Sequence, residues 1–277
     1  MPGFEQLKKM SSWRRIAGGV WKPHTSPQVL GSDEIDTLIT QQFIEDARSK
    51  TDERITITHV CVKIVAEIIR RNPELNAIMV RGRPMKRPNV DIFVQVAVPA
   101  RSGGRGADLS GVKITNADQK SIVEIAKEVN GRADRVRKGK DKEIEQTKRT
   151  LDMIPMPLLG KMLDALAFLT FDLELDLSRF GVKSDPFGSA CITNCASFGV
   201  NIGYAPLVPF SRTPMLFLIG ETRDRPAVVD GEIAIRPVMI NTATFDHRLY
   251  DGYQVGKVVK DYVGLFQDRE WMDSCLL

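Results

Sequence analysis

Residues 240–252 restrict most strongly what this chain can fold into. Their sequence, Ile-Asn-Thr-Ala-Thr-Phe-Asp-His-Arg-Leu-Tyr-Asp-Gly, alternates apolar and β-branched residues with polar ones and ends in an Asp-Gly pair. This pattern predicts a β-strand followed by a turn. The strand would carry His247, between Asp246 and Arg248, into the turn. A histidine in that position is either a catalytic base or an ordinary polar residue at a strand end.

Length and composition predict a globular protein with a substantial core. The chain has 277 residues, of which 43% are hydrophobic, enough for one large domain or two small ones. The 39 Lys and Arg residues against 35 Asp and Glu give a net charge of +4. This excess is too small to indicate a nucleic-acid partner, although it suits an anionic ligand such as a nucleotide-bearing thioester.

Cysteine usage and hydropathy further restrict the class of protein. The four cysteines are Cys61, Cys191, Cys195 and Cys275. Cys191 and Cys195 are spaced for neither a CxxC redox pair nor a zinc knuckle, and no second cysteine pair or nearby histidine completes a metal site with them, so we expect no metal site. The chain starts without a charged-then-apolar leader, which predicts a cytoplasmic protein with reduced thiols. Five charged residues interrupt the apolar run at 158–177, so no transmembrane span is expected.

Apolar periodicity predicts helices at two places. Residues 56–71 carry apolar side chains at helical spacing after Thr56 or Thr58 as a cap, and residues 121–140 form a second amphipathic pattern. We expect His59, inside the first helix, to be structural.

β-rich runs predict the strands. They lie at residues 27–36, 90–99 and 214–220, and Asp230-Gly231 marks a later hairpin turn. The glycine-rich residues 102–106 match no phosphate-loop spacing, which favours a hairpin turn there as well.

Four phrases resemble one enzyme family and occur in its order. They are Pro-Glu-Leu-Asn-Ala at 73–77, Asn-Ala-Asp-Gln-Lys at 116–120, Ile-Thr-Asn at 192–194 and His-Arg-Leu-Tyr-Asp-Gly at 247–252. Together they resemble the acyltransferase component of the 2-oxoacid dehydrogenase complexes, whose catalytic domain has the chloramphenicol acetyltransferase-like fold. The resemblance implies an α/β (α+β) fold with a mixed central sheet flanked by helices.

The resemblance also implies a reaction and its residues. The family moves an acyl group between coenzyme A and a thiol such as dihydrolipoamide, which needs a base, an oxyanion donor and exclusion of water. His247 matches the general base and Thr193 the oxyanion-stabilising hydroxyl. Ser197 is a weaker candidate if the register is shifted, and Thr193 could instead be an ordinary strand residue bonded to backbone.

Supporting roles follow from the same resemblance. Asp251 would hold the histidine loop by ion pairing, with Arg248 and Gly252 as structural supports. Asn194 is a further support that could orient Thr193 or touch substrate. No motif identifies residues that bind the phosphates of coenzyme A.

The family's partners are expectations too. The resemblance implies a homotrimer with a channel at each interface, and further assembly of trimers stays open. Residues 1–277 contain no lipoyl or subunit-binding domain, so a lipoyl group supplied in trans, another acceptor, or an excised fragment are alternatives. A non-catalytic trimeric scaffold is the competing class of protein, against which the retained His247 and Asp251 argue.

We expect one catalytic domain with two additions. Residues 1–22 would be a docking segment that packs its tryptophans on the domain. Residues 143–186 would be a helical insert, its helix starting after Pro155 and Pro157. The insert could extend the core or a subunit interface, cover the active-site channel and enlarge an acyl pocket, or lie on a membrane surface.

Overall fold

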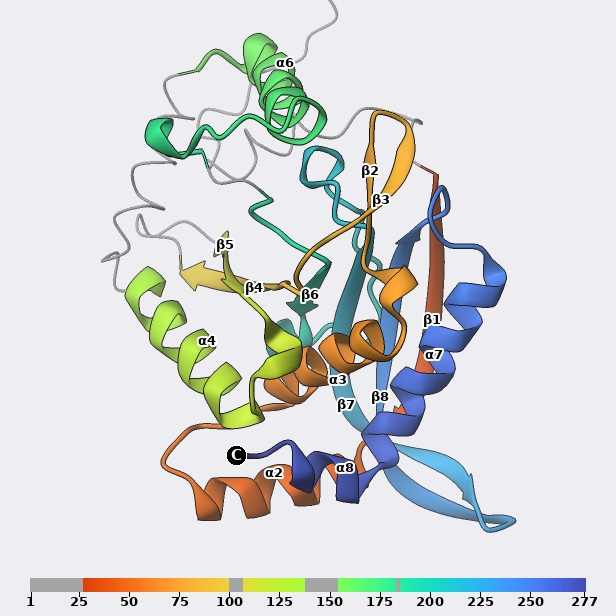
Figure 1. Cartoon of the computed structure of the whole chain (residues 1–277). Helices are drawn as coiled ribbons and strands as arrows, with labels where there is room; N and C mark the ends of the chain where they lie inside the picture. Colours follow the sequence, from red (N-terminus) through yellow and green to blue (C-terminus); the bar gives the residue numbers. More distant parts are fainter. Residues whose placement is uncertain (1–26, 100–106, 138–153, 183–184) are drawn as a thin grey trace, which may run out of the picture.

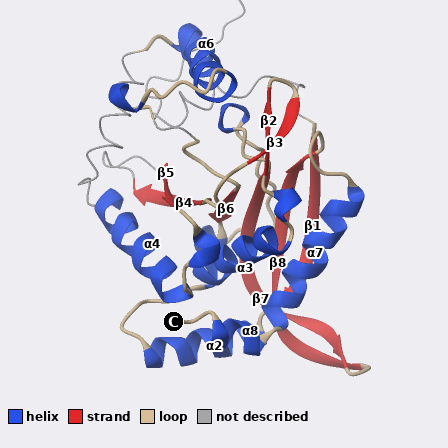
Figure 2. Ribbon diagram, in the orientation of Figure 1, coloured by secondary structure: helices blue, strands red, loops and turns tan. Residues whose placement is uncertain are grey.

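The computed structural model describes residues 27–99, 107–137, 154–182 and 185–277. Its centre is a six-stranded sheet in the order β1-β8-β7-β6-β4-β5 (Figure 1). The strands are β1 (Gln28–Asp36), β4 (Ile92–Pro99), β5 (Ala107–Ile114), β6 (Ala190–Asn194), β7 (Met215–Val229) and β8 (Glu232–Asp246). β6 pairs in parallel with β4 and β7, and the other pairs are antiparallel. The sheet is therefore mixed, as expected, with helices beside it (Figure 2).

Helices pack on one face of this sheet. They are α2 (Leu38–Lys50), α3 (Ile57–Arg71), α4 (Ile122–Arg137), α7 (Gly252–Gln267) and α8 (Arg269–Ser274). α3 is central and almost wholly buried, and its apolar residues form one core with Ala190, Ile192 and Phe217 of the strands. The expected helices at 56–71 and 121–140 and the strands at 27–36 and 90–99 are thus confirmed to within a few residues.

The segment that connects β6 to β7 contains no strand and covers part of the sheet face opposite the helices. The hydroxyl of Thr242 donates to the carbonyl of Gly203 at 2.5 Å, and that of Thr244 donates to the carbonyl of Ala205 at 2.7 Å. Leu207 of this segment is buried together with Leu216 and Leu218 of β7. The segment is therefore fixed on the sheet by both polar and apolar contacts.

Strands β7 and β8 continue beyond the sheet as a two-stranded ribbon, visible at the lower right of Figure 1. The turn at its tip is Asp230-Gly231, both with positive φ, which confirms the expected hairpin. Val228, Ile233 and Ile235 are 76%, 82% and 78% exposed. Val228 pairs with Ile233, so these side chains share one face of the ribbon. The projecting ribbon thus presents an apolar face to solvent.

The insert lies beside a small hairpin of β2 (Ala77–Val80) and β3 (Arg83–Lys86), at the top of Figure 1. Its helix α6 spans Met156–Ala167 and is followed by a π-helical turn at Phe168–Asp172. The helix starts two residues earlier than expected, after Pro155 and not after both prolines. Pro157 lies inside the first turn, where no backbone N–H partner is needed.

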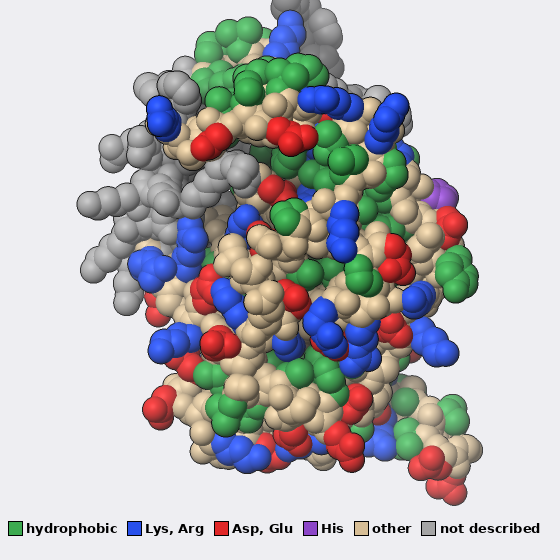
Figure 3. All heavy atoms as spheres, viewed as in Figure 1, with side chains coloured by type: hydrophobic (Ala, Val, Ile, Leu, Met, Phe, Trp, Pro, Cys, Tyr) green, Lys and Arg blue, Asp and Glu red, His purple; other side chains and the backbone are tan. Residues whose placement is uncertain are grey.

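Hydrophobic side chains gather over α6 in Figure 3. Leu158 is 54% and Phe168 52% exposed, whereas Leu159 and Leu163 are buried. The expected docking segment at 1–22 and the first part of the insert lie outside the described residues. Within the described part of the chain, every helix is too short or too polar to cross a bilayer.

Candidate active site

His247 is held at the end of β8 by backbone hydrogen bonds. Its N–H donates to the carbonyl of Pro27 at 2.8 Å, and the N–H of Asp246 donates to the carbonyl of Pro214 at 2.9 Å. The imidazole is exposed in the single chain. Its Nδ1 lies 2.9 Å from the carbonyl oxygen of Tyr250.

This contact determines the tautomer of His247. A carbonyl oxygen can only accept a hydrogen bond, so Nδ1 must carry the proton. In the neutral ring Nε2 is then left with its lone pair, and the ring orientation is fixed by the turn. Nε2 is therefore the ring nitrogen that can accept a hydrogen bond or a proton.

Tyr250 anchors the turn that supplies this carbonyl. Its ring is 2% exposed and meets Phe245 edge-on at 6.2 Å, and its hydroxyl donates to the carbonyl of Leu75 at 2.7 Å. Burial raises the pKa of the Tyr250 phenol, so the group stays a neutral donor. Sequence reasoning gave Tyr250 no role. The sequence feature that could have indicated its role is an aromatic residue three positions after a histidine in a short turn.

Asp251 makes different contacts from those that the resemblance implied. Its carboxylate accepts the backbone N–H groups of Tyr253 at 2.8 Å and Gln254 at 3.2 Å, and so caps α7. Gln254 returns a contact to the N–H of Asp251 at 3.0 Å, completing a capping box. Among the described residues this carboxylate is used as a helix cap and not in an ion pair. Gly252 is the first residue of that helix.

Arg248 pairs with its neighbour Asp246. Its guanidinium reaches the buried Asp246 carboxylate at 2.6 and 2.9 Å. This hydrogen-bonded pair raises the pKa of Arg248 and stiffens the residues on either side of His247. Arg248 thus supports the turn through Asp246.

Thr193 lies near the end of β6, with its side chain 8% exposed. It shares a sheet face with Cys191, two residues earlier. Burial raises the pKa of Cys191 to about 12 and also raises that of Cys195. Both groups remain thiols at neutral pH. Ser197 is exposed on a separate 3₁₀ turn, η5 (Ala196–Phe198).

Asn194 connects β6 to α3. Its amide donates to the hydroxyl of Thr58 at 2.9 Å, and its carbonyl accepts the N–H of Ala196 at 2.9 Å. Both polar ends are engaged in shaping the turn after Thr193, which holds that strand end in place.

Strand register separates Thr193 from His247 within one chain. Thr193 pairs with Leu218, and Leu218 pairs with Thr242, which precedes His247 by five residues. At about 3.3 Å per residue and about 4.8 Å per strand, the two lie roughly 16 Å apart along the strands and roughly 10 Å across them. A single chain therefore does not bring the candidate base to the candidate oxyanion donor.

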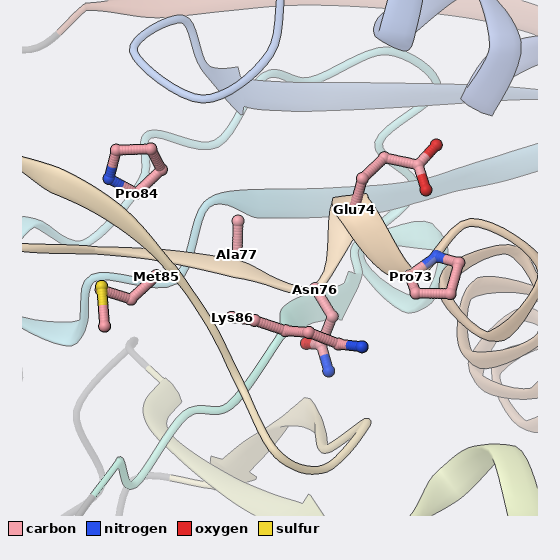
Figure 4. A pocket seen from close by; sticks show the side chains of 7 residues that line it. All are labelled: Pro73, Glu74, Asn76, Ala77, Pro84, Met85 and Lys86. Carbon is pink, nitrogen blue, oxygen red and sulfur yellow. The ribbon is translucent and has the colours of Figure 1, made fainter.

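One surface cavity is distinct from both residues. It has a volume of about 270 Å³ and lies between η1 (Pro73–Leu75) and the β2–β3 hairpin. Figure 4 shows the side chains that line it: Pro73, Glu74, Asn76, Ala77, Pro84, Met85 and Lys86. The described residues contain no group of three or more His, Cys, Asp or Glu side chains arranged to hold a metal ion.

Three solved structures share the fold. The cubic core of the pyruvate dehydrogenase multienzyme complex aligns with a TM-score of 0.69 and 17% identity, over 98% of this chain and 95% of that chain. The Azotobacter vinelandii dihydrolipoamide acetyltransferase aligns at 0.71 and 16%, over 98% and 94%. Chloramphenicol acetyltransferase aligns at 0.50 and 11%, over 96% and 100%. The chloramphenicol acetyltransferase-like fold is thus confirmed.

Sequence comparison agrees with the fold. The dihydrolipoyllysine-residue acetyltransferase of the Bacillus subtilis pyruvate dehydrogenase complex is 25% identical over 271 residues, covering 96% of this chain and 51% of that protein. The chain spans about half the length of the curated relatives that it matches. A family model matches residues 5–154 and 186–272 and leaves 155–185 unmatched. The chain belongs to the family of 2-oxoacid dehydrogenases acyltransferases, as the catalytic domain.

Proposed function

We propose that this protein transfers an acyl group between coenzyme A and the thiol of a dihydrolipoyl group, with His247 as general base. The observation that carries the proposal is the 2.9 Å contact of His247 Nδ1 with the carbonyl of Tyr250. It directs the free Nε2 outward on a rigid turn, and a scaffold protein has no need of such an arrangement. Family membership supports the reaction type.

The chemistry needs no covalent enzyme intermediate. Nε2 of His247 takes the proton of the acceptor thiol, and the thiolate sulfur bonds to the thioester carbonyl carbon. The carbonyl oxygen becomes an oxyanion, to which the hydroxyl of Thr193 donates. Collapse of the intermediate breaks the other carbon–sulfur bond. The departing thiolate recovers the proton from the imidazolium, so protons and electrons balance.

The site would be completed by a second copy of the chain. Thr193 and His247 are separated by a distance on the order of 19 Å within one copy, far beyond hydrogen-bond reach of a common substrate. We propose a homotrimer in which one subunit supplies His247 and its neighbour supplies Thr193. A closed ring of identical heterologous interfaces gives one such site per interface.

The projecting ribbon supports self-association. Val228, Ile233 and Ile235 expose an apolar face that is unusual for a free two-stranded ribbon, because such ribbons are marginally stable in water. Their burial against another subunit would stabilise both the ribbon and the oligomer. Further assembly of trimers and a separate lipoyl-bearing protein remain parts of this proposal.

The first test measures transfer from acyl-coenzyme A thioesters to free dihydrolipoamide by mass spectrometry. We expect transfer by the wild-type protein and a fall of about 10²–10⁴ in His247→Ala, the usual contribution of a general base. The control for folding is the oligomeric state of His247→Ala, which should equal that of the wild-type protein. A folded oligomer that transfers no acyl group would favour the scaffold.

Subunit mixing tests whether the site is shared. His247→Ala and Thr193→Ala proteins would each be nearly inactive alone. After they are unfolded and refolded together, about a quarter of randomly assembled interfaces would join an intact His247 to an intact Thr193. We expect activity to reappear in the mixture. A mixture that stays as inactive as its components would contradict a shared site.

A further inference from the structure

We infer that residues 205–210 form the wall that selects the acyl group, and that the insert fixes this wall through an ion pair between Asp172 and Arg212. The inference rests on the proposed function, because it describes the acyl pocket of that same site. It assigns a role to the segment that the family model leaves unmatched.

The first step is the apolar face around Thr193. Strand pairing places Leu218 beside Thr193 and Leu216 beside Cys191, with all four side chains on one face. Leu216 and Leu218 are buried against Leu207 of the connecting segment. A thioester whose carbonyl oxygen meets Thr193 therefore has its acyl chain among leucine side chains.

The second step is how the start of the wall is held. Thr244 donates its hydroxyl to the carbonyl of Ala205 at 2.7 Å, and Thr242 donates to Gly203 at 2.5 Å. Both threonines are buried in β8. The wall therefore begins at a fixed position on the sheet.

The third step is how its other end reaches the insert. Val208 and Phe210 pack against the buried Leu159 and Leu163 of α6. Phe210 also packs in a second cluster, with Phe171 of the insert. The backbone then closes a 3₁₀ turn, η6 (Pro209–Ser211). The same six residues thus contact the sheet face of Thr193 at one end and the insert at the other.

The ion pair fixes this contact. Arg212 donates to Asp172 Oδ1 at 2.9 Å and makes a second, shorter bond to Oδ2, and its guanidinium lies 5.1 Å from the centre of the Phe171 ring. It also donates to the carbonyl of Met79 in β2 at 3.0 Å. The Asp172 carboxylate accepts the N–H of Arg81 at 2.8 Å.

The Asp172 carboxylate is buried and paired, and the Arg212 side chain is 19% exposed. Asp172 is 6% exposed, and its hydrogen bonds with Arg212 hold the pKa of its carboxyl below the usual range. Breaking such a pair leaves an unpaired buried charge, so the local geometry must relax. Loss of Asp172 would therefore loosen Arg212 and the wall that precedes it.

The composition of the apolar cluster around Thr193, to which the wall contributes Ala205 and Leu207, indicates the substrate class. The cluster around Thr193 consists of Leu207, Leu216 and Leu218 with Cys191, Cys195 and Ala205, all uncharged. A dicarboxylic acyl group would place a carboxylate against these apolar side chains, which cannot hydrogen-bond it or pair with its charge. The pocket formed by this chain therefore favours an uncharged acyl group.

The test compares kcat/KM for acetyl-, isobutyryl-, hexanoyl- and succinyl-coenzyme A with dihydrolipoamide as acceptor. Leu207→Ala removes three carbons from the wall, and we expect the hexanoyl-to-acetyl ratio to rise about tenfold. Leu207→Val gives a smaller change in the same direction and serves if the alanine variant does not fold. Succinyl-coenzyme A should be the poorest donor for the wild-type protein.

Asp172→Asn tests the ion pair. We expect a shifted hexanoyl-to-acetyl ratio and faster hydrogen exchange of the amides at 205–213. The matched control is Asp46→Asn, which breaks the ion pair with Arg269 on the exposed surface of α2, at the end of the molecule away from α6 (Figure 1). This control should change neither the ratio nor exchange at 205–213.

Each outcome decides a separate point. Unchanged hexanoyl-to-acetyl ratios in folded, active Leu207 variants would contradict the proposal that residues 205–210 select the acyl group. Succinyl-coenzyme A as the best donor would contradict the proposal that the pocket favours an uncharged acyl group. If Asp172→Asn, like Asp46→Asn, changed neither the acyl ratio nor hydrogen exchange at 205–213, the proposed role of the ion pair would be wrong. Absence of any transfer by the wild-type protein would instead contradict the proposed function, whereas hydrogen exchange would still show whether Asp172 holds the segment.

Discussion

The imidazole Nδ1 of His247 and the carbonyl oxygen of Tyr250 lie 2.9 Å apart, and the Tyr250 hydroxyl in turn donates to the carbonyl of Leu75 at 2.7 Å. The orientation of the candidate base therefore depends on a buried phenol on the other side of the turn. Because Tyr250 acts through its backbone and its anchor, it is a positioning residue.

Tyr250→Phe should weaken both stability and turnover. The change leaves the Leu75 carbonyl without its donor in a buried position, which costs about 1–3 kcal/mol. We expect a lower melting temperature and a lower kcat with little change in KM. Tyr253→Phe is the matched control, because Tyr253 is 80% exposed. Equal behaviour of the two variants would show that the hydroxyl of Tyr250 does not position the turn.

Asp251 variants distinguish a helix cap from an ion pair. Asp251→Ala should lower the free energy of unfolding by about 0.5–2 kcal/mol, the usual cost of losing an N-cap side chain. Asp251→Asn should be nearly neutral, since asparagine caps equally well. Denaturant unfolding of both variants gives the comparison. If Asp251→Asn lowered the free energy of unfolding as much as Asp251→Ala, the charge of Asp251 would be required. That result would favour the ion pair that the resemblance implies.

His59 should make the stability depend on pH. It is 2% exposed, accepts the N–H of Thr56 at Nδ1 at 3.1 Å, and its pKa is lowered from 6.5 to about 4, chiefly by burial and then by Arg48 and Arg54. The unfolded chain therefore binds the proton more tightly. The contribution of neutral His59 is complete above pH 6.5 and is lost as the pH falls toward 4, on the order of 3 kcal/mol in all.

The measurement is the free energy of unfolding of the wild-type protein and of His59→Gln between pH 4 and 8. The difference between the two should change over the window from pH 6.5 down to 4 and stay constant above it. A difference independent of pH would show that His59 does not titrate with unfolding.

Two glycines with similar backbone angles form a matched pair. Gly188 has φ +73°, and a Cβ there would lie 2.5 Å from the carbonyl oxygen of Asp91; Gly181 has φ +77° with nothing within 4 Å. Alanine at either position pays about 1–2 kcal/mol for the left-handed conformation. Gly188→Ala should lose a further 1–3 kcal/mol or so through the steric clash. Thermal unfolding of both variants checks this, and equal losses would contradict the clash.

Much of the architecture was readable from local sequence patterns. The alternation before His247 predicted β8, and the helical spacing after Thr56 predicted α3, because burial on one face dictates these periods. The insert was less readable. Apolar residues continue past Ala167, yet the α-helix ends there, because Phe171 packs against the β2–β3 hairpin and Asp172 is drawn to Arg212.

By itself the sequence determined the family and the residue types at the candidate site, since short ordered phrases carry both. Only the tertiary structure decided how those residues are used. The tautomer of His247 depends on the carbonyl of Tyr250, and the contacts of Asp251 depend on where α7 begins. The ion pair of Asp172 with Arg212 joins residues 40 positions apart. Periodicity records which side chains are buried, but pairings between distant polar groups follow from how the buried elements pack.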